Sequence, residues 1–273
     1  MEVIQSLLLK WLLTITMSSL IYGNLSILIS ARRLYFLATV TPHSALLAVI
    51  IAVIINRIVG VLNEFLWSAI IGCALMFCVG YFIRRGSDTD TITSVYVALT
   101  ASASVIAMNY ILTSFKISYS LWSVILGDPL LIAWSDLPPL LLITVITIFL
   151  TALSLKYHVY AGVDPDYVKL VSTRKWLYDY ALFFLLGVTS VALIRVTGFI
   201  LQHILILLPS IVAAKISESS KKAYAAGLIT SILAGVLGLQ IAILTNSSPS
   251  GMIGGIFILI YVISLVISKI RRG

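Results

Sequence analysis

The chain has 273 residues, of which 60% are apolar and only 10% are charged, and its mean hydropathy is +1.12. A soluble domain carries about 25% charged residues, so this composition excludes an ordinary soluble protein and indicates one that crosses a membrane several times. The formal net charge of +8 is therefore not expected to mark a nucleic-acid-binding surface; it reports orientation in the bilayer instead.

Nine segments are long and apolar enough to span a bilayer. A span needs about 20 apolar residues to cross a hydrocarbon core of about 30 Å. The sequence therefore predicts an all-α, polytopic membrane helical bundle of about nine transmembrane helices, with residues 1–273 as a single transmembrane domain. The expected spans are 5–30, 34–56, 65–83, 92–113, 137–155, 177–195, 198–214, 223–244 and 252–268.

Lys and Arg residues are concentrated in alternate connections between these spans. Of the 18, 14 lie in five segments: 32–33, 84–90, 156–175, 215–222 and 269–272. The remaining four fall on the opposite side: Lys10, Arg57, Lys116 and Arg195. Because cytoplasmic connections carry the excess of basic residues, we expect the N-terminus outside and the C-terminus in the cytoplasm. The first span follows Met1-Glu2 without a basic leader, so no cleavable signal peptide is expected.

Residues 156–179 form a polar island, which we expect in the cytoplasm. It carries 7 of the 28 charged residues in less than a tenth of the length. Asp164 suits a helix N-cap and Pro165 the first helical position, so a short helix is predicted over 164–171. Its apolar residues share one face: Tyr167, Leu170 and Val171. Such a helix is suited to gripping a partner; a solvated interfacial helix that merely ties two spans together is the alternative.

Two histidines lie within predicted spans. His43 follows Pro42, which removes one helical hydrogen bond, and shares a helix face with Thr39 four residues earlier. An ionisable residue in a span is a functional candidate by default, which makes His43 and His203 candidate ligands. A neutral imidazole hydrogen-bonded inside the bundle is the alternative for each. His158, which borders the polar island, is expected at the surface.

Close packing is predicted at two kinds of place. The connection 195–198 is too short for a loop, so the chain either turns tightly or has a helix broken at depth. Small residues recur every four positions, which lets helices approach closely. These stripes are Ser94, Ala98 and Ser102 in the fourth span, and Gly227, Ser231 and Gly235 in the eighth.

Two motifs that are common in enzymes are missing from the sequence. No Gly is followed by Lys, so there is no phosphate-binding loop, and no HExxH zinc-protease motif occurs. We therefore expect that this chain does not hydrolyse ATP itself. Cys73 and Cys78 point to different faces of a helix, so neither a disulfide nor a chelating pair is expected.

Six blocks of the sequence resemble, in order, the membrane permease subunits of ATP-binding-cassette (ABC) importers for zinc, manganese and iron. The blocks are RRLYFLATVTPHSALLAVI at 32–50, DTITSVYVALTAS at 90–102, LGDPLLIAWSDL at 126–137, DPDYVKL at 164–170, GFILQHILILLP at 198–209, and GVLGL at 235–239 followed by PSG at 249–251. Each block alone is weak, but six in the same order cover nearly the whole chain.

The resemblance implies a type II ABC importer-like fold in a prokaryotic plasma membrane. It implies a second permease subunit, identical or different, about a two-fold axis, two ABC ATPase subunits that hydrolyse the ATP, and an extracytoplasmic metal-binding protein that delivers the cargo. The chain itself would be no enzyme and would bind no cofactor, since the divalent metal ion is the transported substrate. The island 156–179 would couple to the ATPase through Asp164, Pro165, Asp166, Tyr167, Leu170 and Val171.

The sequence departs from the family pattern around the candidate pore. Thr39 stands where the family usually has an Asp four residues before the His, and a hydroxyl is a poorer ligand for a divalent cation than a carboxylate. His203 stands where the family tends to have a small residue. The candidate metal ligands in the pore are thus His43, Thr39 and His203.

Two other classes of function remain open at this stage. A secondary transporter would need no ATPase but should show an ionisable relay in its spans, where this chain has few charges. A non-transporting membrane assembly protein would tolerate the loss of His43 and of the cytoplasmic helix.

Overall fold

A computed structural model describes residues 2–86, 88–115, 127, 129–171 and 173–272, and within these the chain is helical without any strand. Lys116 and Asp128 lie outside this part. The helices are α1 (Glu2–Ala31), α2 (Tyr35–Val59), α3 (Glu64–Arg84), α4 (Thr89–Ser114), α6 (Leu137–Val163), α7 (Pro165–Val171), α8 (Lys175–Ile216), α9 (Ser220–Thr245) and α10 (Pro249–Arg272), with 3-10 turns η1 (Pro129–Leu131) and η2 (Trp134–Asp136). The predicted all-α bundle is confirmed.

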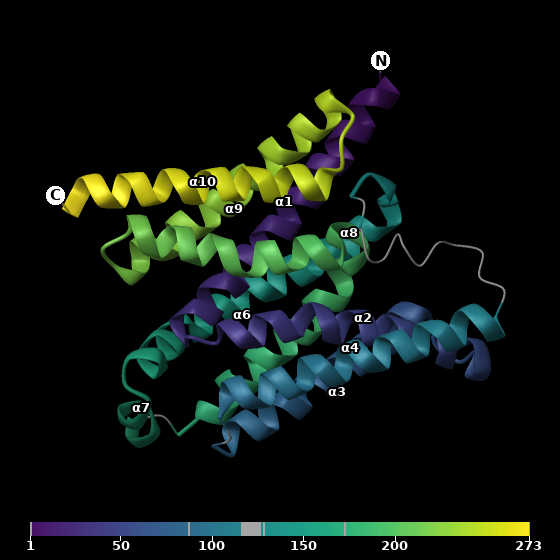
Figure 1. Ribbon diagram of the computed structural model, residues 1–273, viewed down its shortest axis with the longest axis horizontal. Helices are drawn as coiled ribbons and strands as arrows, with labels where there is room; N and C mark the ends of the chain where they lie inside the picture. The colour runs from purple at the N-terminus through teal and green to yellow at the C-terminus, as the bar shows by residue number, and fades with distance from the viewer. Residues whose placement is uncertain (1, 87, 116–126, 128, 172, 273) are drawn as a thin grey trace.

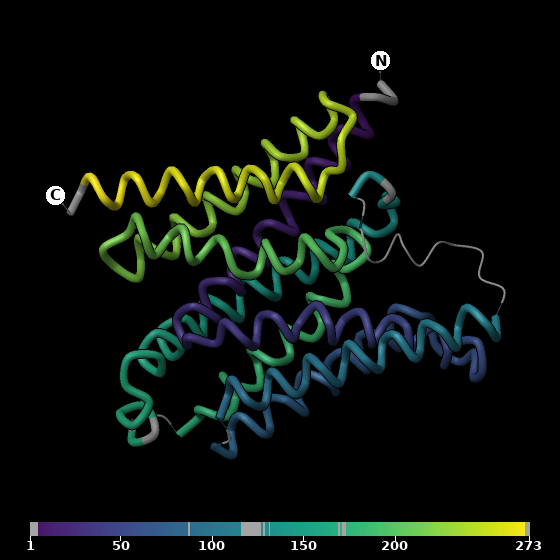
Figure 2. The backbone as a smooth tube through the Cα atoms, viewed as in Figure 1, coloured from purple at the N-terminus to yellow at the C-terminus, as the bar shows by residue number. Residues whose placement is uncertain are grey.

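Eight of the described helices are long and apolar enough to cross a membrane, and α8 accounts for two of the predicted spans. It has 42 residues, which in a straight helix would extend about 63 Å, twice the hydrocarbon core. Gly198 interrupts it with φ 70° and ψ 169°. Gln202 Nε2 donates to the Ser190 carbonyl at 2.6 Å, although twelve residues would be about 18 Å apart along a straight helix. The chain therefore reverses at Gly198, as Figure 2 traces, and the expected break at 195–198 is confirmed.

The reversal in α8 is covered by one residue of the connection that leads to η1. Gly127 has φ 63°, a left-handed conformation that favours glycine, and it is buried. A Cβ atom at this position would overlap the backbone nitrogen of Gly198. The two glycines thus pack backbone against backbone, and neither a side chain nor a gap separates them.

Helix α8 lies at the centre of the bundle. It contacts α2 and α3 on one side and α1, α9 and α10 on the other, while α4 packs on α2 and α6 on α1 (Figure 1). The core between α1 and α8 is buried and mainly apolar, and includes Leu25, Leu28, Leu186 and Leu201. Both halves of α8 are therefore held by protein, which fixes the position of any side chain that they carry.

The two small-residue stripes behave differently. In α9, Gly227 contacts Ile27 and Gly235 contacts Ser19, both on α1, so the expected close approach is confirmed there. In α4, the residues of the predicted stripe are exposed on the surface of the chain: Ser94, Ala98 and Ser102. For contacts within the chain that prediction is wrong, because Thr93, Thr100 and Ser104 form the buried face of α4.

Candidate functional site

The two candidate histidines of the spans lie next to each other. His43 is on α2 and His203 is on the second half of α8, and their ring centroids are 5.6 Å apart. Phe199, one turn before His203, contacts both rings edge-on, with centroid distances of 4.8 Å to His43 and 4.7 Å to His203. The reversal at Gly198 makes this pairing possible, because it turns the start of the second half of α8 towards α2.

The two rings differ in what holds them. His203 Nδ1 lies 2.8 Å from the Phe199 carbonyl, which as an acceptor fixes the N–H on Nδ1, and the ring also interacts with the backbone of Thr39. The His43 ring has no hydrogen bond within the described residues. His43 is therefore the histidine whose nitrogen atoms are available to a ligand, and His203 is the more firmly oriented of the two.

Thr39 lies one turn before His43, as its spacing predicts. Its hydroxyl donates to the Phe36 carbonyl at 2.7 Å, so the proton is engaged and the oxygen keeps its lone pairs. The side chain is partly exposed on the same face as His43. It can accept a hydrogen bond or hold a water, but it brings no negative charge to the site.

The histidine pair lies on a partly exposed face of the chain at membrane depth. Thr39, His43, Phe199 and His203 all retain some accessible surface. Polar rings in contact with lipid are costly, so a face of this kind is normally covered by protein or lines a water-filled cavity. Among the described residues there is no group of three His, Cys, Asp or Glu that could hold a metal ion. One chain thus offers two imidazoles, half of a tetrahedral ligand set.

His158, expected at the surface, is fully buried, and that prediction is wrong. Helix α6 continues to Val163, beyond the expected end of the span at residue 155, so His158 lies inside the bundle. One turn further on, Gly162 packs so closely on α1 that a Cβ atom would overlap the Ala31 carbonyl. Neither ring nitrogen of His158 has a hydrogen-bond partner in the described part of the chain, and the ring packs edge-on against Tyr157 at 5.1 Å.

The short helix predicted in the polar island is present as α7. Asp164 caps it: its Oδ1 accepts hydrogen bonds from the backbone nitrogens of Asp166 and Tyr167 at 3.1 and 2.9 Å. Val168 is only 7% exposed and attaches the helix to the bundle, whereas Tyr167 and Leu170 are 52% and 86% exposed. The helix thus presents two large apolar side chains outward. The side chain of Val171 lies outside the described part.

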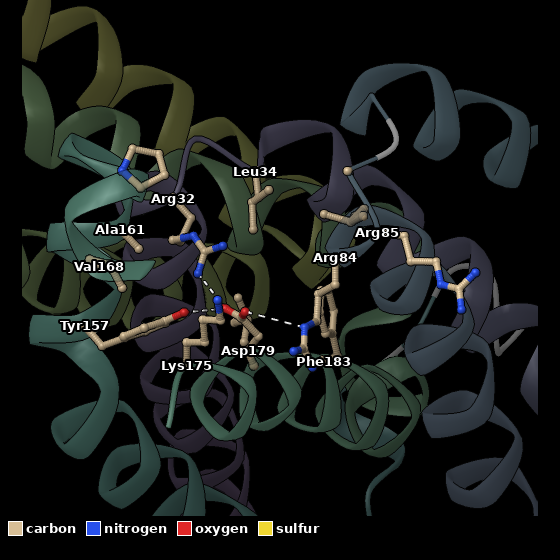
Figure 3. A pocket seen from close by; sticks show the side chains of 14 residues that line it. Arg32, Leu34, Arg84, Arg85, Tyr157, Ala161, Val168, Lys175, Asp179 and Phe183 are labelled. Atoms are coloured by element: carbon tan, nitrogen blue, oxygen red, sulfur yellow. Dashed lines mark hydrogen bonds and ion pairs between the residues drawn. The ribbon is translucent and has the colours of Figure 1, made fainter. Parts of the chain in front are cut away.

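An ion cluster beside α7 joins the ends of four helices. Asp179, at the start of α8, accepts from Arg32 Nη1 at 2.7 Å and from the Tyr157 hydroxyl at 3.1 Å, and Arg84 Nε lies 3.9 Å from its other oxygen (Figure 3). Asp179 belongs to the polar island, but its contact with the arginines was not predicted. An acidic residue at the start of a span, on the side of the chain where the basic residues gather, indicated such an ion pair.

Comparison with known proteins gives consistent matches over most of the chain. The model of the ABC 3 transport family matches residues 4–268. The manganese transport system membrane protein MntC of Listeria monocytogenes is 24% identical over 242 residues, which cover 88% of this chain and 83% of that protein. The chelated iron transport system membrane protein YfeD of Yersinia pestis is 26% identical over 148 residues, 54% of this chain and 50% of that protein.

A solved structure shares the fold. PsaBC from Streptococcus pneumoniae in complex with Fab superposes with a TM-score of 0.79 at 21% identity, covering 94% of this chain and 90% of that chain. At this identity the likeness concerns the fold alone. It supports the helix arrangement described above.

Proposed function

The chain belongs to the ABC 3 transport family, and from this premise we infer that it is the membrane permease subunit of an ABC importer with a type II-like fold, whose cargo is a divalent metal ion. Membership of this family excludes the two alternatives named above, a secondary transporter and a non-transporting membrane assembly protein. The chain works with a separate ATPase, and the metal ion passes through it as substrate.

The observation that supports a pore at His43 is the pairing of His43 and His203 on a partly exposed face at membrane depth. We propose that a second permease subunit covers this face about a two-fold axis. The axis would then bring two copies of the pair together, so that up to four imidazoles line one path. Neutral imidazole suits zinc and other borderline metals, whereas Mn²⁺ prefers carboxylate oxygen. Because Thr39 supplies no carboxylate, the proposed cargo is a nitrogen-preferring metal, although the relatives carry the names of manganese and iron systems.

The two ends of the bundle differ in charge, and we propose a different protein partner for each end. Helix α7 and the basic ends of α1 and α3 lie together, which we assign to the cytoplasm, and the Arg195–Glu64 contact at 3.5 Å lies at the opposite end, which we assign to the outside. We propose that Tyr167 and Leu170 dock in an ABC ATPase, and that an extracytoplasmic metal-binding protein delivers the ion at the outer end.

The test is metal uptake into liposomes that carry the complete transporter. We expect His43→Ala to abolish uptake of Zn²⁺, because it removes the least restrained imidazole of the pair. Thr39→Asp should shift preference towards Mn²⁺, because it adds a hard oxygen ligand one turn away. Leu142→Ala, at an exposed position of α6 outside the histidine face, is the control and should transport normally. Unimpaired uptake by His43→Ala would contradict this proposal. His43 would then be a packing residue, and His203 would be the remaining candidate ligand.

A further inference from the structure

A cavity of about 390 Å³ lies beside α7, where α1, α3, α6 and α8 end. Its position is at the basic end of the bundle, between the ends of the spans and the proposed ATPase-binding helix (Figure 3). Its volume is within the range of small-ligand sites, about 300 to 1,000 Å³. The proposed pore on α2 and the second half of α8 does not use any of the residues that line this cavity.

The rim of the cavity carries more positive than negative charge. Four cationic side chains line it: Arg32, Arg84, Arg85 and Lys175. The acidic residue among the lining residues is Asp179, so the excess is 4 − 1 = 3 positive charges. Arg32 and Arg84 are engaged with Asp179, whereas Arg85 packs on the Tyr81 ring at 4.7 Å and Lys175 has no ion pair within the described residues. Among the described residues, two of the four cations thus have no carboxylate partner.

The inner wall of the cavity is apolar. Leu34, Ile83, Leu182 and Phe183 line it, and three of these side chains are almost completely buried. They belong to the core of the bundle or pack against it, so this wall faces the interior, whereas Arg32, Arg84 and Asp179 are partly exposed. The cavity therefore matches a ligand with an anionic head and an apolar stem.

We propose that this cavity binds the phosphate-bearing headgroup of an anionic phospholipid from the leaflet on the α7 side. Arginine side chains bind phosphate oxygens in a fork geometry, and basic pockets between transmembrane helices are suited to anionic headgroups. The lipid phosphate would lie at the rim beside Lys175, at the start of α8. Arg85, at the end of α3, would turn from the Tyr81 ring to reach the same headgroup, since Figure 3 shows its side chain directed away from Lys175. It would thereby tie together the end of α3 and the start of α8, the two elements next to α7.

The test uses the permease with its ATPase in phosphatidylcholine nanodiscs that contain a small fraction of phosphatidylglycerol. The readout is the number of phosphatidylglycerol molecules retained per complex, by native mass spectrometry. The double variant R85Q/K175Q spares the two arginines that hold Asp179, and it should bind phosphatidylglycerol roughly 30-fold more weakly. R85K/K175R keeps both charges and should retain the lipid. K221Q/K269Q, which removes two exposed basic residues outside the cavity, should behave as the wild type.

Three outcomes would overturn the proposal. The first is equal phosphatidylglycerol retention by R85Q/K175Q and the wild type. The second is retention of added inorganic phosphate with the same variant dependence but without lipid preference, which would make a soluble anion the occupant. The third is loss of the ATPase from R85Q/K175Q without any change in bound lipid, which would assign the cavity to the protein partner. None of these measurements depends on metal uptake, so they test the lipid site independently of the proposed pore.

Discussion

His43 and His203 are paired but not equivalent, and this asymmetry has chemical consequences. The Phe199 carbonyl fixes the N–H of His203, so this ring is held in one tautomer before any ion arrives. His43 has no such restraint in the described residues. If the pair binds the transported ion as proposed, an oriented ring beside an unrestrained one suits a site that must take the ion up and then release it.

Protonation of these imidazoles provides a direct prediction. Imidazole binds a metal only when neutral, and its reference pKa is about 6.5. We expect uptake per ATP hydrolysed to fall as the pH is lowered from about 7.5 to about 5.5, through this titration range. The loss should be smaller in Thr39→Asp, because a carboxylate with a reference pKa of about 3.9 stays charged over that interval. Uptake per ATP that is constant over the whole range in the wild type would contradict a histidine-lined path.

The sequence predicted single residues well where the signal was local. Thr39 and His43 lie on one helix face because four residues make about one turn, and Asp164 caps α7 because its side chain reaches the next backbone amides. The contact between His43 and His203 could not be predicted, since it depends on which helices are neighbours. The prediction for His158 failed because the end of an apolar segment does not mark the end of a helix, and α6 continues past it.

At the scale of elements, α7 is the clearest case of a surface without a partner inside the chain. It has seven residues, is attached by Val168 and presents Tyr167 and Leu170 outward. An isolated helix of this length is not stable in water, so the Asp164 cap and the contact of Val168 hold it in place. The helix is therefore ordered before a partner binds.

We expect Tyr167→Ala combined with Leu170→Ala to uncouple ATP hydrolysis from uptake. Losing two exposed apolar anchors should cost about 2 kcal/mol of ATPase binding, or about 30-fold in affinity. Insertion into the membrane and the melting temperature of the permease should be unchanged, because neither side chain belongs to the core. Binding of the purified ATPase and substrate-stimulated hydrolysis are the measurements.

The matched control for that double variant is Val163→Ala. Val163 is 80% exposed at the end of α6, close in sequence to α7 but outside it, and its replacement should leave coupling intact. Normal coupling in the Tyr167/Leu170 variant would contradict the proposed docking. Helix α7 would then be a solvated link between two spans.

At the scale of the whole molecule, composition alone predicted the spans, and their ends agree with the helices to within a few residues in most cases. The arrangement of the helices could not be predicted. In a membrane the lipid-facing and protein-facing residues are equally apolar, so hydrophobicity does not reveal that α8 lies between α2 and α1. The exposed stripe on α4 illustrates the same limit: small residues show that close approach is possible, but not which partner makes it.

Orientation is the prediction that belongs to this scale. In a chain with Cys73 and Cys78 replaced by Ala, Ser247→Cys should react with a membrane-impermeant maleimide on intact cells. Lys221→Cys should react only after permeabilisation, because we propose that the basic connections face the cytoplasm. Both positions are exposed, so burial does not confuse the comparison. The reverse pattern of labelling would invert the proposed topology, and with it the side on which α7 and the basic cavity lie.

The contact between Gly127 and Gly198 joins residue 127 and the α8 reversal into one mechanical unit. Since no side chain lies between the two backbones, there is nothing compressible to absorb a displacement of either one. A push or pull on residue 127 must be transmitted to Thr197 and Gly198, and His203 lies little more than one helical turn beyond them. A protein that docks at this end of the chain would thus act on the histidine pair through residue 127, and the stiffness of this contact depends on the absence of a Cβ atom at Gly127.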